Sequence, residues 1–180
     1  NLSTTSNWFV WHTSLGSAST GGNFLNLDLS KYKGYDGADT NQYMGTTGVT
    51  NTLIGCTNET WTGIANNYIC YAWKAVSGVS AFGSYAGNSS TQTVVYANSN
   101  TFSAKWILIK NMSNPADWQI FDVYRGFGVN NSTASRSLVA SNSTAEGSNA
   151  GITINNEGFV FTDASTVLNA GYTYIYAAFA

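Results

Sequence analysis

The sequence carries very little charge. Of its 180 residues, seven are Lys or Arg and nine are Asp or Glu, which gives a formal net charge of -2. The basic residues are scattered singly and form no stripe that would bind phosphate groups, so we expect no nucleic-acid partner. No apolar run approaches the roughly 18 residues of a membrane-spanning helix, and no charged leader precedes an apolar run at the start. We therefore expect no membrane span and no signal peptide.

Histidine and cysteine are equally scarce. His12 is the single histidine, and Cys56 and Cys70 are the two cysteines. A zinc site needs more Cys or His ligands than these, so we expect no metal and no cofactor. The two cysteines either form one disulfide that closes a short loop or stay free. Cys70 lies within an apolar strand pattern, which is typical of a small core residue.

The pattern of paired carboxylates that marks many glycosidases is also missing. Those enzymes hold two carboxylates at a fixed separation, commonly on one strand when the fold is a β-sandwich. Here the nine acidic residues are dispersed and no Glu-x-Asp-x-x-Glu cluster occurs. His12 stands beside Ser14 without an acidic neighbour in sequence, which is typical of an ordinary strand residue rather than a general base. We expect no enzyme and no catalytic residue.

Aromatic and small polar residues are abundant instead. Hydrophobic residues make up 43% of the chain and aromatic residues 14%, which is enough to build a core. Apolar and polar residues alternate over short runs that are separated by clusters of Gly, Asn, Asp and Ser. About ten such runs predict an all-β fold, a two-sheet antiparallel sandwich of the jelly-roll type, as one domain over residues 1–180. The predicted strands are 7–12, 24–30, 67–76, 91–97, 104–110, 117–124, 135–141, 151–156, 158–162 and 171–180.

The sequence also resembles itself. "NWFVWHTSLG" at 7–16 aligns with "DWQIFDVYRG" at 117–126, an offset of 110 residues. "YICYAW" at 68–73 aligns with "YIYAAF" at 174–179, an offset of 106 residues. We therefore expect an internal two-fold repeat. Its halves lie at about 7–76 and 105–180.

The first half of this predicted repeat lacks its initial strand. In the second half, "KWILIKNMSNPADW" at 105–118 supplies a strand before Trp118, whereas the sequence before Trp8 matches only the end of that hairpin loop. A strand without its neighbour leaves unpaired backbone groups. Three explanations remain open: upstream residues were removed or not included, which we favour, or another chain donates the strand, or the edge is exposed.

One loop and one tryptophan are candidates for glycan binding. "KYKGYDGADTNQYMG" at 31–45 places Asp36 and Asp39 beside Tyr35 in a Gly-rich stretch. Oxygen ligands next to aromatic rings suit a sugar or a calcium ion, although Asp and Gly are also what a plain turn requires. Trp61, outside any predicted strand, would either stack on a sugar ring or anchor its loop in the core.

The C-terminal strand is nearly uncharged and alternates between two faces. Tyr172, Tyr174 and Tyr176 share one face, and the opposite face, with Ile175, Ala177 and Phe179, is predicted to be core. The tyrosine row either packs under the second sheet or, with Trp8, forms a contact between subunits. A strand this apolar should be paired on both sides, so we place it inside a sheet.

Several of these stretches together resemble a known family. "YICYAWKAVSGVSAFGSYAGNSS", "FSAKWILIKN", "DWQIFDVYRG", "NEGFVF" and "GYTYIYAAFA" resemble an uncharacterised domain that recurs in tail-fibre and other virion proteins of marine bacteriophages, notably cyanophages and pelagiphages. The resemblance runs from about Trp8 to the end. It implies a lectin-like jelly roll of the concanavalin type, located on an exposed virion appendage, and it brings no catalytic residue with it.

The expected function is therefore that of a non-enzymatic virion module. It would belong to a tail fibre, a head fibre or a surface decoration, at the virion surface, and would assemble as a homo-oligomer with other virion subunits. Host-surface glycans are a further candidate partner. The alternative is a secreted bacterial carbohydrate-binding protein or a subunit of an extracellular filament.

Overall fold

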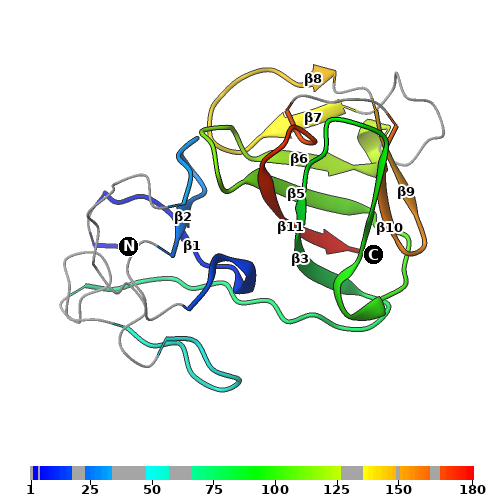
Figure 1. The fold of residues 1–180 in the computed structure, drawn as a ribbon. Coiled ribbons are helices and arrows are strands. Elements are labelled where there is room, and N and C mark those ends of the chain that lie inside the picture. Colours follow the sequence, from blue (N-terminus) through cyan, green and yellow to red (C-terminus); the bar gives the residue numbers. More distant parts are fainter. Residues whose placement is uncertain are drawn as a thin grey trace.

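The computed structural model describes residues 2–3, 5–17, 23–33, 48–56, 66–126, 136–148, 151–162 and 167–180. These residues form three antiparallel sheets, and their helices are short 3-10 turns (Figure 1). No helix in this part of the chain is long and apolar enough to cross a membrane. The fold is all-β, as the alternating sequence pattern predicts.

The largest sheet has six strands, and the C-terminal strand lies inside it. The strand order is β3-β11-β5-β6-β7-β8. Tyr176 of β11 lies opposite Gly83 on one side and opposite Ile109 on the other, so β11 is paired along both edges and the predicted position is confirmed. The strands are β3 (Ser80–Ala86), β5 (Trp106–Asn111), β6 (Gln119–Asp122), β7 (Arg136–Val139), β8 (Gly147–Ser148) and β11 (Thr173–Phe179).

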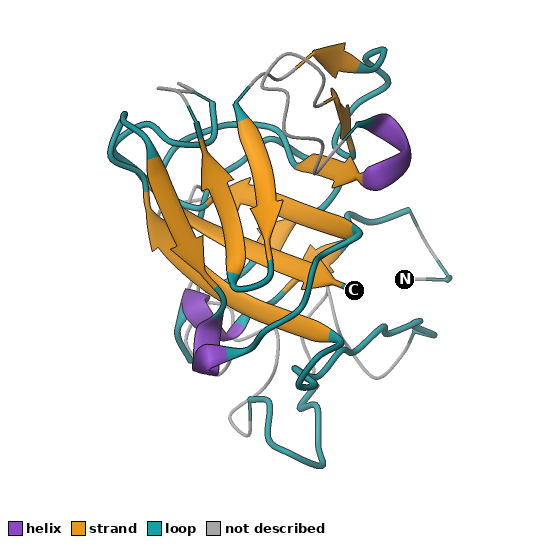
Figure 2. Cartoon of the chain, turned by 90° about the vertical axis from the view of Figure 1, so that its right-hand side faces the viewer, coloured by secondary structure: helices purple, strands orange, loops and turns teal. Residues whose placement is uncertain are grey.

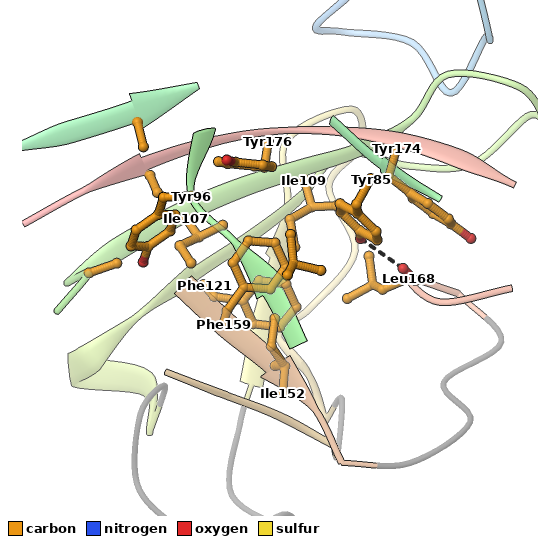
Figure 3. Close-up of a cluster of buried hydrophobic side chains, with 14 of the residues drawn as sticks. Tyr85, Tyr96, Ile107, Ile109, Phe121, Ile152, Phe159, Leu168, Tyr174 and Tyr176 are labelled. Atoms are coloured by element: carbon orange, nitrogen blue, oxygen red, sulfur yellow. Dashed lines mark hydrogen bonds between the residues drawn. The ribbon is translucent and has the colours of Figure 1, made fainter. Parts of the chain in front are cut away.

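A three-stranded sheet covers one face of the six-stranded sheet. Its order is β4-β10-β9, and the two layers are visible in Figure 2. Both sheets contribute side chains to one buried cluster, the main core, which is the arrangement of a β-sandwich. Tyr85 and Tyr174 stack there with centroids 5.0 Å apart (Figure 3). The strands of the smaller sheet are β4 (Gln92–Val95), β9 (Ile152–Asn155) and β10 (Gly158–Phe161).

A two-stranded sheet packs against the opposite face of the six-stranded sheet. It pairs β1 (Phe9–Val10) with β2 (Leu25–Asn26), and the 3-10 helix η1 (Thr13–Leu15) follows β1. Leu15 and Leu25 form a second buried cluster with Trp118 and Ile175. The indole N–H of Trp118 donates to the carbonyl of Asn26 at 2.7 Å. The N-terminal hairpin is thereby held on the sheet that contains β11.

The tyrosine face of β11 belongs to the main core, as in the first of the two predicted alternatives, and not to a contact between subunits. Tyr174 and Tyr176 are 0% and 2% exposed, and Tyr176 accepts a hydrogen bond from the N–H of Ala97. The burial raises the pKa of both phenols. Because the space between the sheets is filled by these rings, neither tyrosine is available to a second subunit. Tyr172, at the edge of β11, is exposed.

Two strands were missed, β3 and the two-residue β8, and one was wrongly predicted. β3 contains Gly83, whose small size is required because a Cβ there would lie 2.6 Å from the hydroxyl of Tyr176. By their propensities, Ser and Gly in this stretch indicate a turn. The sequence pattern therefore does not predict this strand. The range 67–76, predicted as a strand, forms no strand and ends in an isolated bridge between Val76 and Ser80.

The hairpins at 9–26 and 119–139 correspond in their first strands at an offset of 110 residues and in their second strands at an offset of 113 residues. Phe9 pairs with Asn26 in the first, and Gln119 pairs with Val139 in the second. Both first strands lead into a 3-10 helix whose first backbone donors are capped by a side chain, His12 before η1 and Asp122 before η3 (Val123–Arg125). Both helices end at a glycine with positive φ.

The predicted closing strands do not match in the same way. Residues 174–179 lie in β11, whereas residues 68–73 form no strand. The jelly-roll connectivity and the internal repeat are therefore not confirmed as a whole by the described elements.

Candidate binding surface

The range 66–76, which we call the aromatic segment, is extended and lies on the surface. Every residue from Ile69 to Val76 is exposed, and the segment leads into β3 as a long trace without an arrow (Figure 1). Within the described chain, the backbone groups of residues 68–73 form no hydrogen bond. The side chains of this stretch favour a strand, but its backbone N–H and C=O groups have no partner strand within the described chain.

Both ends of the aromatic segment are fixed. At its start, the carbonyl of Asn67 accepts from the N–H of Leu2 at 2.7 Å, and the N–H of Asn67 donates to the hydroxyl of Ser3 at 3.1 Å. At its end, the N–H of Val76 donates to the carbonyl of Ser80 at 3.2 Å. Anchors at both ends hold the exposed middle in an extended conformation.

Three exposed rings line up on this surface, and we call them the aromatic strip. The rings of Trp8 and Tyr71 stack with centroids 6.4 Å apart, and those of Tyr71 and Trp73 stack at 6.1 Å. The side chains are 49%, 60% and 66% exposed along that order. Such a group of apolar surface is typical of an interaction site rather than of an isolated exposed residue.

The backbone of Trp8 is held by the N-terminal hairpin. Its N–H donates to the carboxylate of Asp28 at 3.0 Å, and its carbonyl accepts from the N–H of Leu27 at 2.9 Å. Lys74 is the one charged residue in the sequence of the aromatic segment. The surface offers ring faces and unpaired backbone groups, which suit stacking and strand pairing and supply no acid or base.

His12 is engaged in the fold at both ring nitrogens. Nδ1 accepts from the N–H of Ser14 at 3.0 Å, so Nε2 carries the proton and donates to the carbonyl of Tyr176 at 3.2 Å. Burial lowers the pKa of the imidazole below its usual value, and the hydrogen bond to Tyr176 opposes that shift. His12 therefore caps η1 and ties it to β11, and the Ser14 hydroxyl plays no part in this contact.

Lys110 is a buried cation that the sequence pattern did not single out. Its ammonium donates to the carbonyls of Ser30 and Ala116. Burial lowers its pKa to about 8, and the nearby carboxylate of Asp117 opposes that shift. Because the ammonium joins β5 to two loops, its role is structural.

The other charged groups in the described ranges are mostly paired or dispersed. Arg125 contacts both Asp122 and Glu146, and Glu146 also pairs with Arg136 at 3.0 Å. Within the part of the chain that the structure describes, no three His, Cys, Asp or Glu side chains gather as metal ligands.

The candidate residues from the sequence fall into three groups. Trp8 lies in the aromatic strip, whereas Tyr35, Asp36, Asp39 and Trp61 lie outside the described residues. Tyr172 is exposed and directly precedes β11.

The two cysteines are free thiols. Cys56 and Cys70 are both exposed and form no disulfide. The placement of Cys70 in the core is wrong, because the aromatic segment that carries it has no second layer packed on it.

Sequence reasoning missed Tyr71 and Trp73. Their alternation with Cys70 and Ala72 was interpreted as one face of a half-buried strand. The alternation does indicate a strand-like conformation, but it carries no information on whether a partner strand is present in the chain.

Comparison with known proteins gives one match along the chain. A model of a domain of unknown function (DUF7483) matches residues 1–180. No curated protein and no solved structure matches the chain.

Proposed function

The chain belongs to the DUF7483 family of domains of unknown function, and we propose that it is a non-enzymatic structural module of a bacteriophage virion appendage. The observation that carries the proposal is the exposed aromatic strip beside an unpaired, extended backbone. Apolar surface of this kind is stabilised when another molecule removes it from water, at about 25 cal/mol per Å². A module that assembles with other subunits gains that stabilisation on assembly.

The assignment to a virion rests on the sequence resemblance to tail-fibre and other virion proteins of marine bacteriophages. The low charge suits subunits that pack closely. Partners would be other virion subunits, including further copies of the chain, at the virion surface. Tyr172 offers a second exposed aromatic contact.

We further propose that the sandwich is a jelly roll of the concanavalin-like type built from an internal two-fold repeat. Support for the repeat comes from the two hairpins, because in each of them the first strand leads into a 3-10 helix that is capped by a side chain. The offset between Phe9 and Gln119 is the 110 residues of the sequence alignment.

Replacement of one ring of the aromatic strip tests the assembly role. Trp73→Ser should lower incorporation of the chain into phage particles, because it removes about 0.5–1.5 kcal/mol of ring contact per interface, equivalent to about 2- to 12-fold in affinity. Incorporation is measured by quantitative mass spectrometry of purified particles.

Tyr124→Ser is the matched control, because Tyr124 is 96% exposed on η3 and lies outside the strip. It should leave incorporation unchanged. Equal incorporation of both variants, or absence of the chain from particles, would contradict the proposed function.

A secreted carbohydrate-binding protein is the second candidate. The nearly parallel rings of Trp8, Tyr71 and Trp73 favour it, because successive sugar rings stack on such faces. Binding of the isolated monomer to a glycan array, lost in Trp73→Ser and kept in Tyr124→Ser, would favour this candidate over the first.

A further inference from the structure

β3 forms one edge of the six-stranded sheet, and its outer side has no partner strand among the described residues (Figure 1). Just after β3, the N–H of Gly87 donates to the carbonyl of Tyr172 and continues the ladder between β3 and β11. The odd-numbered residues of β3 therefore bond to β11, and the even-numbered residues point their N–H and C=O groups outward. At Phe82 and Ser84 these outward groups form no hydrogen bond with another described residue.

β3 also lacks the residues that usually protect an edge strand. Residues 77–87 contain no charged side chain and no proline, which are common means by which edges avoid pairing with another strand. The ladder with β11 runs from Ser80 to Ala86, so the edge is long enough to hold a further strand. The outer side of β3 is therefore open to strand addition.

The turn before β3 sets the register of such a strand. Val76 and Ser80 form an isolated antiparallel bridge, and each donates its N–H to the carbonyl of the other, at 3.2 and 2.9 Å. In an antiparallel hairpin the next hydrogen-bonded pairs lie two residues further along each strand. If the aromatic segment continued this hairpin along β3, the pairs would be Lys74 with Phe82, Ala72 with Ser84 and Cys70 with Ala86. Free backbone groups on both sides would then meet in one ladder.

The side chains of the aromatic segment suit this register. Residues of β3 that bond to β11 carry their side chains into the main core, as Ala81 and Tyr85 do. Paired positions share a face of the sheet. The pairs on the main-core face would be Ala75 with Ala81, Trp73 with Gly83 and Tyr71 with Tyr85. Lys74, the one charged residue of the segment, would lie on the opposite face, whereas a shift by one residue would turn it toward the core.

In the structure the hairpin stops at Val76 and Ser80. The carbonyl of Lys74, which would accept from Phe82 in a longer hairpin, accepts instead from the hydroxyl of Ser80 at 2.9 Å. Before Lys74, no backbone hydrogen bond joins the aromatic segment to β3.

The ring of Tyr71 is held by the N-terminal hairpin instead. It stacks on Trp8, which directly precedes β1. The hairpin of β1 and β2 packs on the face of the six-stranded sheet opposite to the main core. Because a longer hairpin along β3 would place Tyr71 on the main-core face beside Tyr85, the two placements of its ring exclude each other.

We propose that the aromatic segment has two positions, an open one in which Tyr71 stacks on Trp8 and a closed one in which residues 70–76 pair with β3 as a further strand of the sheet. The open position is the one in the structure and the major one in the isolated chain, so amide exchange at residues 68–73 stays rapid there. Closure takes the aromatic strip apart and thereby regulates the surface of the proposed function. This consequence rests on the proposed function, whereas the two positions do not.

A segment of the same chain is the occupant that the connection favours. Residues 77–79 join the aromatic segment directly to β3, so its local concentration at this edge exceeds that of a strand from a second copy. The bridge between Val76 and Ser80 also fixes its direction before the rest of the ladder forms.

Disulfide trapping tests the closed position. Cys56→Ser first removes the other exposed thiol. In this background, Ala86→Cys places a thiol directly opposite Cys70 in the closed ladder, with the two Cα atoms about 5.5 Å apart, which is within the range of a disulfide. Mild oxidation should therefore join positions 70 and 86 within one chain. The rate of disulfide formation is measured by mass spectrometry of the peptides.

Ser84→Cys in the same background is the matched control. Ser84 is exposed, like Ala86, and lies on the same strand and the same face. It is diagonal to Cys70 in the closed ladder, with the two Cα atoms about 7–8 Å apart, which is beyond the reach of a disulfide. Its disulfide should form on the order of tenfold more slowly. Equal rates at both positions, no disulfide at either, or a disulfide that joins two chains would overturn the closed position.

Trp8→Ser, added to the Ala86→Cys chain, tests the exchange between the two positions. Loss of the stacking on Tyr71 should raise the population of the closed position, and with it the rate of disulfide formation, by about 2- to 12-fold. Tyr124→Ser removes an exposed ring outside the aromatic strip and should leave the rate unchanged. An unchanged or lower rate in Trp8→Ser would overturn the exchange.

The outcome is separable from the proposed function. The trapped chain should be depleted from phage particles relative to the same chain after reduction. Trapping that leaves incorporation unchanged would remove the assembly role of the aromatic strip and keep the closed position. Lower incorporation of Trp73→Ser without any trapping would remove only the closed position.

Discussion

Removal of residues 174–180 abolishes cooperative folding. β11 pairs with β3 over seven positions and with β5 over six, so its loss divides the six-stranded sheet. It also removes Tyr174 and Tyr176 from the main core. Loss of one large buried side chain costs about 3–5 kcal/mol, and the stability of a whole domain is about 5–15 kcal/mol. Circular dichroism should therefore show no thermal transition.

Deletion of Ala180 alone is the control for this truncation. Ala180 is exposed and its N–H donates to the carbonyl of Val79, so its loss removes one surface hydrogen bond. The control should melt cooperatively, within about 1 kcal/mol of the intact chain. A soluble truncation at 173 with a cooperative transition would contradict the role assigned to β11.

Gly158→Ala should strongly destabilise the three-stranded sheet. A Cβ at Gly158 would lie 1.8 Å from the carbonyl oxygen of Val94 in β4, and this contact is with backbone, which has no rotamer to change. β4 must therefore move away from β10, which opens the core around Phe159. We expect a loss of about 3 kcal/mol, lowering Tm by about 6–12 °C.

Gly171→Ala is the matched control, because no atom lies within 4 Å of a Cβ at that position. Chemical denaturation of both variants measures the difference in the free energy of unfolding. Equal stability of Gly158→Ala and Gly171→Ala would show that β4 and β10 are not packed as described.

Alternation of apolar and polar residues predicted most of the sheet strands, because each has a buried face and an opposite face of different polarity. β5, β6 and β10 lie at or near their predicted ranges. β3 was missed because Gly83 is selected by the ring of Tyr176, a contact between residues far apart in sequence. Local propensity does not contain that information.

The candidate surface was predictable only in part. Trp8 was singled out because its strand lacks a neighbour, and it lies in the aromatic strip. Tyr71 and Trp73 have the alternation of a buried strand, and burial depends on whether a neighbouring strand is present rather than on the segment itself. For the same reason Cys70 was wrongly assigned to the core.

The central claim is that the aromatic segment is uncovered in the isolated chain and covered in the assembly to which it belongs. Amide exchange of residues 68–73 measured on the isolated chain and on the chain within purified particles tests it directly. The account predicts rapid exchange in the isolated chain and slow exchange in the particle. Equally rapid exchange in both would contradict it.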